Sequence, residues 1–197
     1  MPGRGRPRGF DRDAALRTAM RLFWARGYEG VAISDLTAEM GIGTRSLYTA
    51  FGSKERLFRE AVDLYAALDD TAGYCDLPTA RDTVERLLRA RAAAYVDPAT
   101  PPGCMIVLAA TNTSQDNDAV RDFLAGIRAR DRDLLTTRLA KARADGEVPT
   151  ATDPDTVVAF YLSVLYGLSM HAKDGRSAAE LDAVVDTAMA VWDMVVG

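Results

Sequence analysis

The chain has 197 residues and a mass of 21.3 kDa, which suits one sizeable domain or a small domain joined to a larger one and excludes a disulfide-stapled miniprotein. Hydrophobic residues make up 48% and charged residues 26% of the sequence, which excludes a disordered chain. The formal net charge of −4 is unevenly divided, because residues 1–60 carry 11 Lys and Arg against 7 Asp and Glu, whereas residues 61–197 carry 13 against 21.

Apolar residues recur with helical spacing along nearly the whole chain, and strand-like alternation is missing. Asp11 is the expected N-cap of a first helix, Gly27 follows its end, and Ser53 is expected to cap a fourth helix. The pattern in the N-terminal part predicts helices over residues 12–26, 33–40, 44–51 and 54–70.

The C-terminal part is divided by proline and glycine breaks. Asp153 precedes a proline at a first helical position, and Ser177 with Glu180 matches a capping box. Five further helices are predicted, over about residues 79–96, 104–111, 118–144, 154–172 and 177–196.

Two short helices joined by a tight turn with Gly41 and Gly43, next to a longer first helix, form the pattern of a helix-turn-helix. In this motif the second short helix enters the DNA major groove. The sequence therefore predicts an all-α fold of about nine helices, with a three-helix DNA-binding domain at residues 10–56. A flexible basic arm at residues 1–9 precedes it, and a helical ligand-binding and dimerisation domain at residues 57–197 follows it.

The segment from Gly41 to Glu55 contains the run Leu-Tyr-x-x-Phe-x-Ser-Lys-Glu, preceded by Ala15-Leu16 through Phe23 and by Gly27-Tyr28. With these motifs, residues 10–60 resemble the DNA-binding domain of the TetR (tetracycline-repressor-like) family of bacterial transcriptional regulators. The rest of the chain resembles the family in length and helix plan. The resemblance implies a homodimer that binds double-stranded operator DNA and is released by a small-molecule effector.

Six residues on and just after the helix at residues 44–51 are expected to contact DNA: Thr44, Arg45, Ser46, Tyr48, Thr49 and Lys54. The first three lie at the helix N-terminus, which faces base edges, and Arg45 suits a bidentate contact with guanine. Tyr48 and Thr49 are expected at the sugar-phosphate backbone, and Lys54 adds charge beside it. The resemblance implies the same roles. The plainer interpretation of Arg45 and Lys54 is solvated surface charge.

Two features near the motif have open interpretations. Arg4, Arg6 and Arg8 form either an arm for the minor groove or a disordered basic tail. Ala32 stands where the family often has Ser or Thr ahead of the second helix, so either Ser34 caps that helix or its start is weaker. Whether side chains at the start of that helix contact phosphate depends on the same alternatives.

The helix predicted over residues 154–172 is apolar on most of its circumference and so needs cover on two sides. A second copy of the chain can cover the outer side of this helix. The resemblance implies a four-helix interface formed by this helix and the helix at residues 177–196 from each copy. A dimer also matches two recognition helices to successive major grooves, about 34 Å apart, of a palindromic site. The alternative is that both helices are internal core.

The helical domain is also expected to enclose a cavity for an apolar or aromatic effector. Plain core packing is the commoner role for each side chain proposed to line it. The candidates are Tyr65, Tyr74, Tyr95, Cys104, Met105, Asn112, Phe123, Tyr161, Tyr166 and His171. Cys75 and Cys104 are further candidates for sensing electrophiles or oxidants, but neither has a basic residue within two positions to stabilise a thiolate.

Cysteine and histidine usage limits the chemistry. The chain has two cysteines without a Cys-x-x-Cys pair and a single histidine, His171, which is too few ligands for a metal site. A cofactor-binding motif such as GxGxxG is also missing. We therefore expect no cofactor and no enzymatic activity. The longest apolar stretch, residues 157–170, falls short of the ~18 residues of a membrane span. We expect a cytoplasmic DNA-binding regulator without membrane contact. The alternative is a helical small-molecule-binding protein without operator function.

Overall fold

The computed structural model of the chain describes residues 11–68, 71–111 and 117–197, and every regular element in these ranges is a helix. The predicted all-α class is therefore confirmed. In chain order the helices are α1 (Arg12–Arg26), α2 (Ile33–Met40), α3 (Thr44–Phe51), α4 (Lys54–Ala66), α5 (Thr71–Tyr74), α6 (Ala80–Tyr95), α7 (Met105–Thr111), α8 (Asp118–Ala144), α9 (Pro154–Lys173), α10 (Ala178–Ala190) and α11 (Trp192–Val196).

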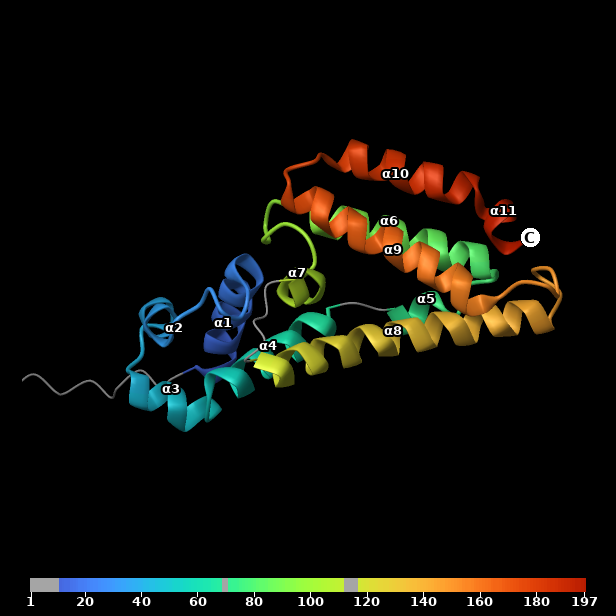
Figure 1. Ribbon diagram of the computed structural model, residues 1–197. Coiled ribbons are helices and arrows are strands. Elements are labelled where there is room, and N and C mark those ends of the chain that lie inside the picture. Colours follow the sequence, from blue (N-terminus) through green and yellow to red (C-terminus); the bar gives the residue numbers. More distant parts are fainter. Residues whose placement is uncertain (1–10, 69–70, 112–116) are drawn as a thin grey trace, which may run out of the picture.

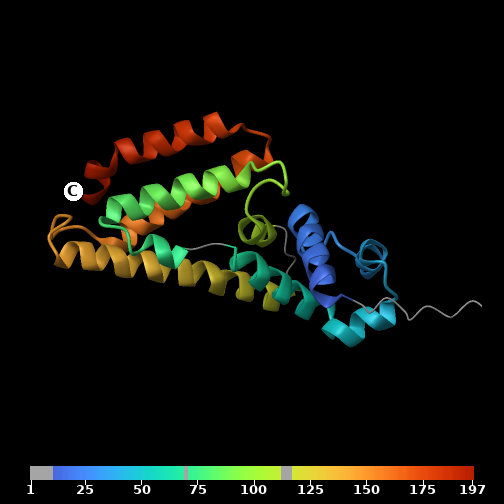
Figure 2. The same cartoon turned by 180° about the vertical axis from the view of Figure 1, so that it is seen from behind.

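The molecule is elongated, with a head formed by α1, α2 and α3 at one end and a body formed by α5 to α11 at the other (Figure 1). Helix α4 packs on α1 and joins the two parts. In the body, α6, α9 and α10 pack against one another, and the long α8 lies against α9. Helix α7 fills the junction of head and body, where it contacts α1, α4, α8 and α9 (Figure 2).

The apolar side chains of the head pack around α1 and α4 and are part of one core cluster that continues into the body. Phe23 is fully buried, and its ring meets that of Phe58 edge-on with the centroids 5.1 Å apart. Leu36 of α2 and Leu47 of α3 are fully buried in the same core cluster. Asp11 caps α1 as predicted, accepting two backbone N–H bonds of the first turn at 3.0 and 3.1 Å. These contacts fix the short helices on a rigid base.

The start of α2 settles the two alternatives that Ala32 leaves open. Ala32 is the N-cap residue, and the carboxylate of Asp35 accepts its backbone N–H at 2.9 Å. The guanidinium of Arg26 at the end of α1 lies 3.8 Å from the same carboxylate. Ser34 lies inside the first turn and is not the cap. Asp35 therefore supplies the acidic half of a capping box without the reciprocal cap side chain, and its contact with Arg26 ties α2 to α1.

The fourth predicted helix is too long at its C-terminus. Helix α4 ends at Ala66 rather than near residue 70, because the backbone N–H of Leu68 turns back to the carbonyl of Tyr65 at 3.1 Å. Leu68 is 70% exposed instead of lying on the buried face. The short helix α5 follows and is not predicted.

The last predicted helix, over residues 177–196, is two helices in the structure. The capping box of Ser177 and Glu180 is confirmed at the start of α10. The chain then turns at Val191, and α11 begins at Trp192. The turn brings the ring of Trp192 against Tyr161 of α9, with centroids 5.5 Å apart, which is the packing reason for the break. Among the described residues this gives two short helices beyond the predicted nine.

Candidate functional site

Helix α3 presents one apolar and one polar face. Leu47 and Phe51, one turn apart, are buried at 0% and 1% exposure and anchor the helix in the head, as predicted. The other side chains of the helix, except the half-buried Ala50, are exposed: Thr44, Arg45, Ser46, Tyr48 and Thr49. Five of the six residues predicted to contact DNA therefore share one solvent-facing surface.

The N-terminus of α3 is open to a negatively charged partner. Gly43 is the N-cap residue, no side chain caps the first turn, and no acidic residue lies in that turn. A Cβ placed on Gly43 would meet no atom within 4 Å, so the approach to this end is unobstructed. The positive end of the helix dipole and the uncapped N–H groups thus face solvent beside Arg45.

Lys54, the sixth predicted residue, lies at the start of α4 and is held by an aromatic ring. Its Nζ sits 4.4 Å from the centroid of Tyr28, which sequence reasoning did not predict as a partner. Burial lowers the pKa of Lys54, and the nearby carboxylates of Glu29 and Asp35 act in the opposite direction. The ammonium group is therefore oriented rather than freely solvated.

Arg12 is a supporting residue that the sequence does not single out. Its guanidinium stacks over the ring of Phe51 at 4.6 Å and lies 2.5 Å from the carboxylate of Glu60. Helical spacing cannot predict the contact between Arg12 and the ring of Phe51, because the two residues are far apart in sequence. Arg12 thus clamps the end of α3 between α1 and α4. The predicted arm residues Arg4, Arg6 and Arg8 lie outside the described residues.

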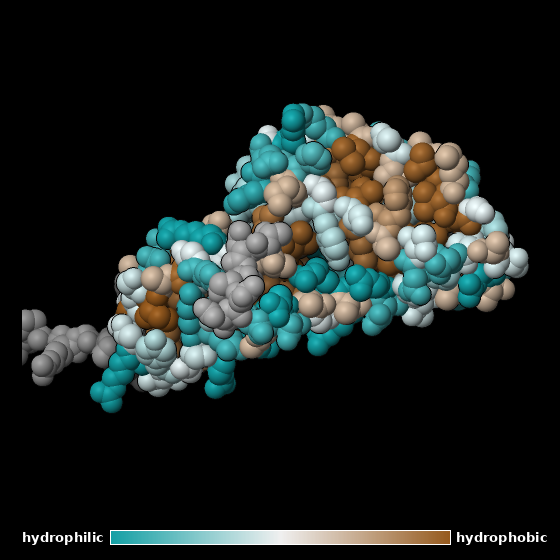
Figure 3. All heavy atoms as spheres, viewed as in Figure 1, coloured by the Kyte–Doolittle hydropathy of each residue, from teal (hydrophilic) through white to brown (hydrophobic). Residues whose placement is uncertain are grey.

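A second exposed surface covers α9 and α10. Phe160 and Val184 are 38% and 37% exposed, although both are large apolar side chains. Apolar side chains gather over these two helices (Figure 3). They line a shallow groove of about 440 Å³, formed by Phe160, Val164, Ala183, Val184, Thr187, Ala188 and Val191. Monomeric proteins rarely leave such a surface uncovered.

The residues predicted to line an effector cavity are placed at different depths. Tyr65, Tyr95, Cys104, Met105 and Tyr161 are buried, whereas Tyr74, Phe123 and Tyr166 are half-buried and His171 is exposed. Burial and the neighbouring Cys104 raise the pKa of both Tyr65 and Tyr95, so these three groups lie together in the interior. Burial raises the pKa of Tyr161 to about 12. Asn112 lies outside the described residues.

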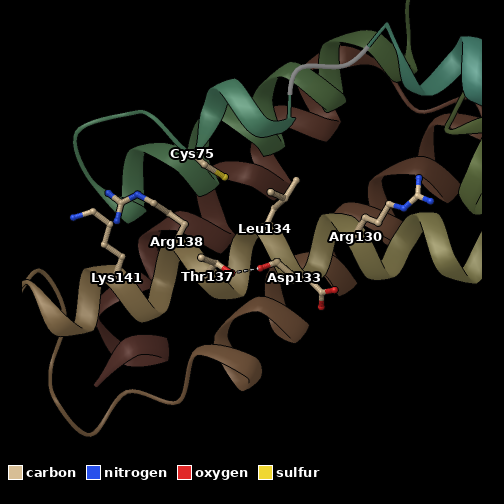
Figure 4. Close-up of a pocket in the computed structure, with 7 residues that line it drawn as sticks. All are labelled: Cys75, Arg130, Asp133, Leu134, Thr137, Arg138 and Lys141. Carbon is tan, nitrogen blue, oxygen red and sulfur yellow. Dashed lines mark hydrogen bonds between the residues drawn. The ribbon is translucent and has the colours of Figure 1, made fainter.

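Two further hollows are lined in part by residues that the sequence analysis singled out. One, of about 320 Å³, is at the junction of head and body and includes Tyr65 and Tyr74 from the predicted set, together with Trp24 and Arg91, which sequence reasoning missed. The other is an open groove of about 610 Å³ between Cys75 and one side of α8, with Leu134 in its centre (Figure 4). Burial raises the pKa of Cys75, partly opposed by Arg138, so its thiol stays protonated at neutral pH.

Two absences hold for the part of the chain that the structure describes. No helix there is long and apolar enough to cross a membrane. Within the same ranges, no three His, Cys, Asp or Glu side chains come together as metal ligands.

Comparisons with known proteins match both parts of the chain. Residues 15–61 match the family described as "Bacterial regulatory proteins, tetR family", and residues 80–191 match "Tetracyclin repressor-like, C-terminal domain". The HTH-type transcriptional repressor ComR of Escherichia coli (strain K12) is 32% identical over 197 residues, covering 98% of this chain and 94% of ComR. The repressor BdcR of the same organism is 29% identical, over 91% of this chain and 87% of its own length.

A solved structure gives the same result in three dimensions. A cysteine mutant of the TetR family transcriptional regulator CifR, complexed with 26-base-pair double-strand operator DNA, superposes with a TM-score of 0.89. It is 43% identical in sequence and covers 95% of this chain and 100% of its own. The chain therefore belongs to the TetR family of bacterial regulatory proteins and is a DNA-binding transcriptional regulator rather than an enzyme.

Proposed function

We propose that the protein is a homodimeric repressor whose two α3 helices bind a palindromic operator and leave it when a small molecule binds. The observation that carries this proposal is the surface of α3. Its apolar side is locked into the head by Leu47 and Phe51, and its polar side and uncapped N-terminus are exposed. Residues 10–56 would then bind DNA, residues 57–197 would sense and dimerise, and residues 1–9 would add a basic arm.

Each predicted contact residue has a distinct role in this proposal. Arg45, with Thr44 and Ser46 beside it, reaches base edges in the major groove, and its guanidinium pairs with guanine. Tyr48 and Thr49 bind the sugar-phosphate backbone. Thr49 Oγ1 donates to the carbonyl of Arg45 at 2.8 Å, so its hydroxyl group must rotate away from this carbonyl to donate to a phosphate oxygen. Lys54 places its charge over Tyr28, at the edge of the same surface.

The dimer is supported by the apolar groove over α9 and α10. Phe160 and Val184 are its exposed large side chains, and a second copy related by a two-fold axis would bury both pairs in a four-helix interface. The acidic body then lies away from the DNA, and its repulsion by phosphate orients the heads toward the duplex. In this role the protein works in the cytoplasm, where the bacterial chromosome lies.

The test is binding of the purified protein to a fluorescently labelled duplex from the region upstream of its own gene. The proposal predicts saturation at two protomers per site, a two-fold symmetric footprint, and affinity that falls as salt concentration rises because counterions are released from phosphate. A monomer in sedimentation experiments, or no binding even at low salt, would leave the alternative of a helical ligand-binding protein without operator function.

A further inference from the structure

The cavity of about 320 Å³ at the junction of head and body has walls from both parts of the molecule. Trp24 of α1 forms one wall, and Tyr65 of α4 and Tyr74 of α5 form others. Ala90, Arg91 and Ala94 of α6 line it on the body side, and Asp97 and Thr100 lie in the loop after α6 as part of the same lining. Leu68, Ala94 and Asp97 are exposed, so the cavity is open to solvent. Its size is at the lower end of the range for small-molecule sites.

The chemistry of the lining favours an aromatic ring. The rings of Trp24 and Tyr65 meet edge-on, with centroids 4.8 Å apart and planes at 72°, so their arrangement offers an aromatic face and an edge to a third ring. Both side chains are 7% exposed and thus held firmly. The half-buried Tyr74 adds a third aromatic wall.

The polar groups of the lining favour a ligand without net charge. Arg91 and Asp97 carry opposite charges, so an anion would meet the Asp97 carboxylate and a cation would meet the guanidinium. Thr100 Oγ1 donates to the carbonyl of Asp97 at 3.3 Å and keeps lone pairs that can accept from a ligand hydroxyl. An uncharged aromatic ring with one hydroxyl group is compatible with Arg91, Asp97 and Thr100 together.

Trp24 also makes one of the contacts that connect the head to the body. Its Nε1–H donates to the carbonyl of Gly103 at 2.9 Å, and this bond is buried. The next residue of that loop, Cys104, donates its backbone N–H to Ser169 Oγ of α9 at 2.8 Å. The loop that receives Trp24 is therefore attached to the helix that carries the apolar outer groove.

We propose that this junction cavity is an effector site for a small uncharged phenol or aryl alcohol, and that its occupant acts on the head through Trp24. The site deepens the function proposed above and rests on it. A ring bound in this hollow lies against the indole of Trp24, and a displacement of the indole moves α1 relative to α6. Because α1 packs on α2, which packs on α3, the displacement carries the recognition helix with it.

The chain contains only two tryptophans, which permits a direct binding test. In a Trp192→Phe background, Trp24 is the sole indole, and its fluorescence reports on the cavity wall. The probe is 4-methylphenol, which is uncharged at neutral pH because the phenol group titrates near pH 10. We expect a saturable change in Trp24 fluorescence with 4-methylphenol and at least about tenfold weaker responses with cyclohexanol, which has no aromatic ring, and with 4-methylbenzoate, which is an anion. Equal responses to all three, or none to the phenol, would overturn the proposal.

Two neighbouring alanines give a matched pair of variants. Both alanines are exposed, but Ala94→Phe adds a ring to the lining of the cavity, whereas Ala93→Phe adds the same ring at a position that does not line it. We expect Ala94→Phe to weaken 4-methylphenol binding by about tenfold or more and Ala93→Phe to leave it unchanged. Equal effects of the two variants would contradict the site.

A third variant separates binding from transmission. Trp24→Phe keeps an aromatic wall and removes the Nε1–H bond to Gly103. In calorimetry it should still bind 4-methylphenol, while the phenol should no longer weaken operator binding measured by fluorescence anisotropy. Undiminished operator release by this variant would overturn the role of Trp24. Failure of the unliganded wild-type protein to bind the operator would instead refute the proposed function itself, so the two failures are distinguishable.

Discussion

Arg138 Nη2 lies 2.8 Å from Glu147 Oε1, and the other oxygen of that carboxylate accepts the backbone N–H of Ala80 at 2.8 Å. The Arg138 side chain is only 7% exposed. One carboxylate therefore joins the last turns of α8, the turn that follows them and the start of α6. Removing it would leave a buried guanidinium without its counter-ion, which costs more than the loss of an exposed ion pair.

Glu147→Gln should lower the free energy of unfolding by about 1–3 kcal/mol, because a charge-assisted bond to a buried arginine is lost. Urea denaturation at fixed protein concentration measures the change. Asp122→Asn removes a carboxylate from an exposed pair with Arg121 and should stay within about 0.5 kcal/mol of wild type. Similar losses in both variants would show that the Arg138 pair is no different from surface pairs.

The ion pair of Arg138 and Glu147 also predicts how the free energy of unfolding changes with pH. Burial acts to raise the pKa of Glu147, but the hydrogen bonds from Arg138 and Ala80 outweigh it and the pKa lies below the usual glutamate value. The carboxylate therefore contributes stability above the pKa of the unfolded state, and this contribution is lost as the pH falls through the folded-state pKa. The difference in stability between wild type and Glu147→Gln should shrink on acidification below about pH 4.3. A difference that grows with acid would contradict this sign.

Gly103 and Gly126 form a matched pair of glycines. Gly103 has φ +79°, and a Cβ there would lie 2.7 Å from the backbone oxygen of Ser169 and 2.8 Å from Leu108 Cδ1. Gly126, inside α8, has open space around such a Cβ. Gly103→Ala should therefore destabilise the protein by about 1–3 kcal/mol, whereas Gly126→Ala should stabilise it by about 0.5–1 kcal/mol. Thermal unfolding of the two variants should shift in opposite directions, and a shift in the same direction would contradict the account.

Val184→Glu should dissociate the proposed dimer. The side chain is 37% exposed in the groove over α9 and α10, so the monomer can accept a carboxylate there, whereas two copies facing each other across a two-fold axis cannot. Sedimentation velocity should show a monomer with an unchanged circular dichroism spectrum. Ala125→Glu, at an exposed position on α8, is the control and should remain dimeric. A dimeric Val184→Glu protein would refute this interface.

Helical spacing was sufficient to predict the recognition helix but not the dimer surface. Along α3, apolar Leu47 and Phe51 alternate with polar side chains at the helical period, so the sequence itself distinguishes the inner face from the outer one. Along α9, apolar residues occur on every side. The structure shows that Leu165 is buried at 6% exposure while Phe160 is 38% exposed, and only packing against α6, α8 and α10 decides between them.

The junction cavity could not be predicted from the sequence either, because it also depends on how the helices pack. Trp24 directly follows the core residue Phe23. A helical pattern gives no reason for the indole of Trp24 to contact the loop that contains Gly103 in the body. Its partner Gly103 is 79 residues away in sequence. Local caps such as Asp11 and Ser177 were predicted correctly, because their bonds close within three residues. Contacts that depend on the relation of head to body carry no local signal.

Operator binding by Arg45→Ala, compared with binding by Arg86→Ala, decides whether α3 reads the operator. Arg86→Ala removes an exposed arginine of the body. Fluorescence anisotropy with the operator duplex, repeated with one base pair changed at a time, gives both affinity and base preference. We expect Arg45→Ala to weaken binding by about 1–3 kcal/mol and to lose discrimination at one guanine, with dimerisation intact, and Arg86→Ala to bind as wild type does. Wild-type affinity and base preference in Arg45→Ala would contradict the assignment of α3 as the helix that reads the operator.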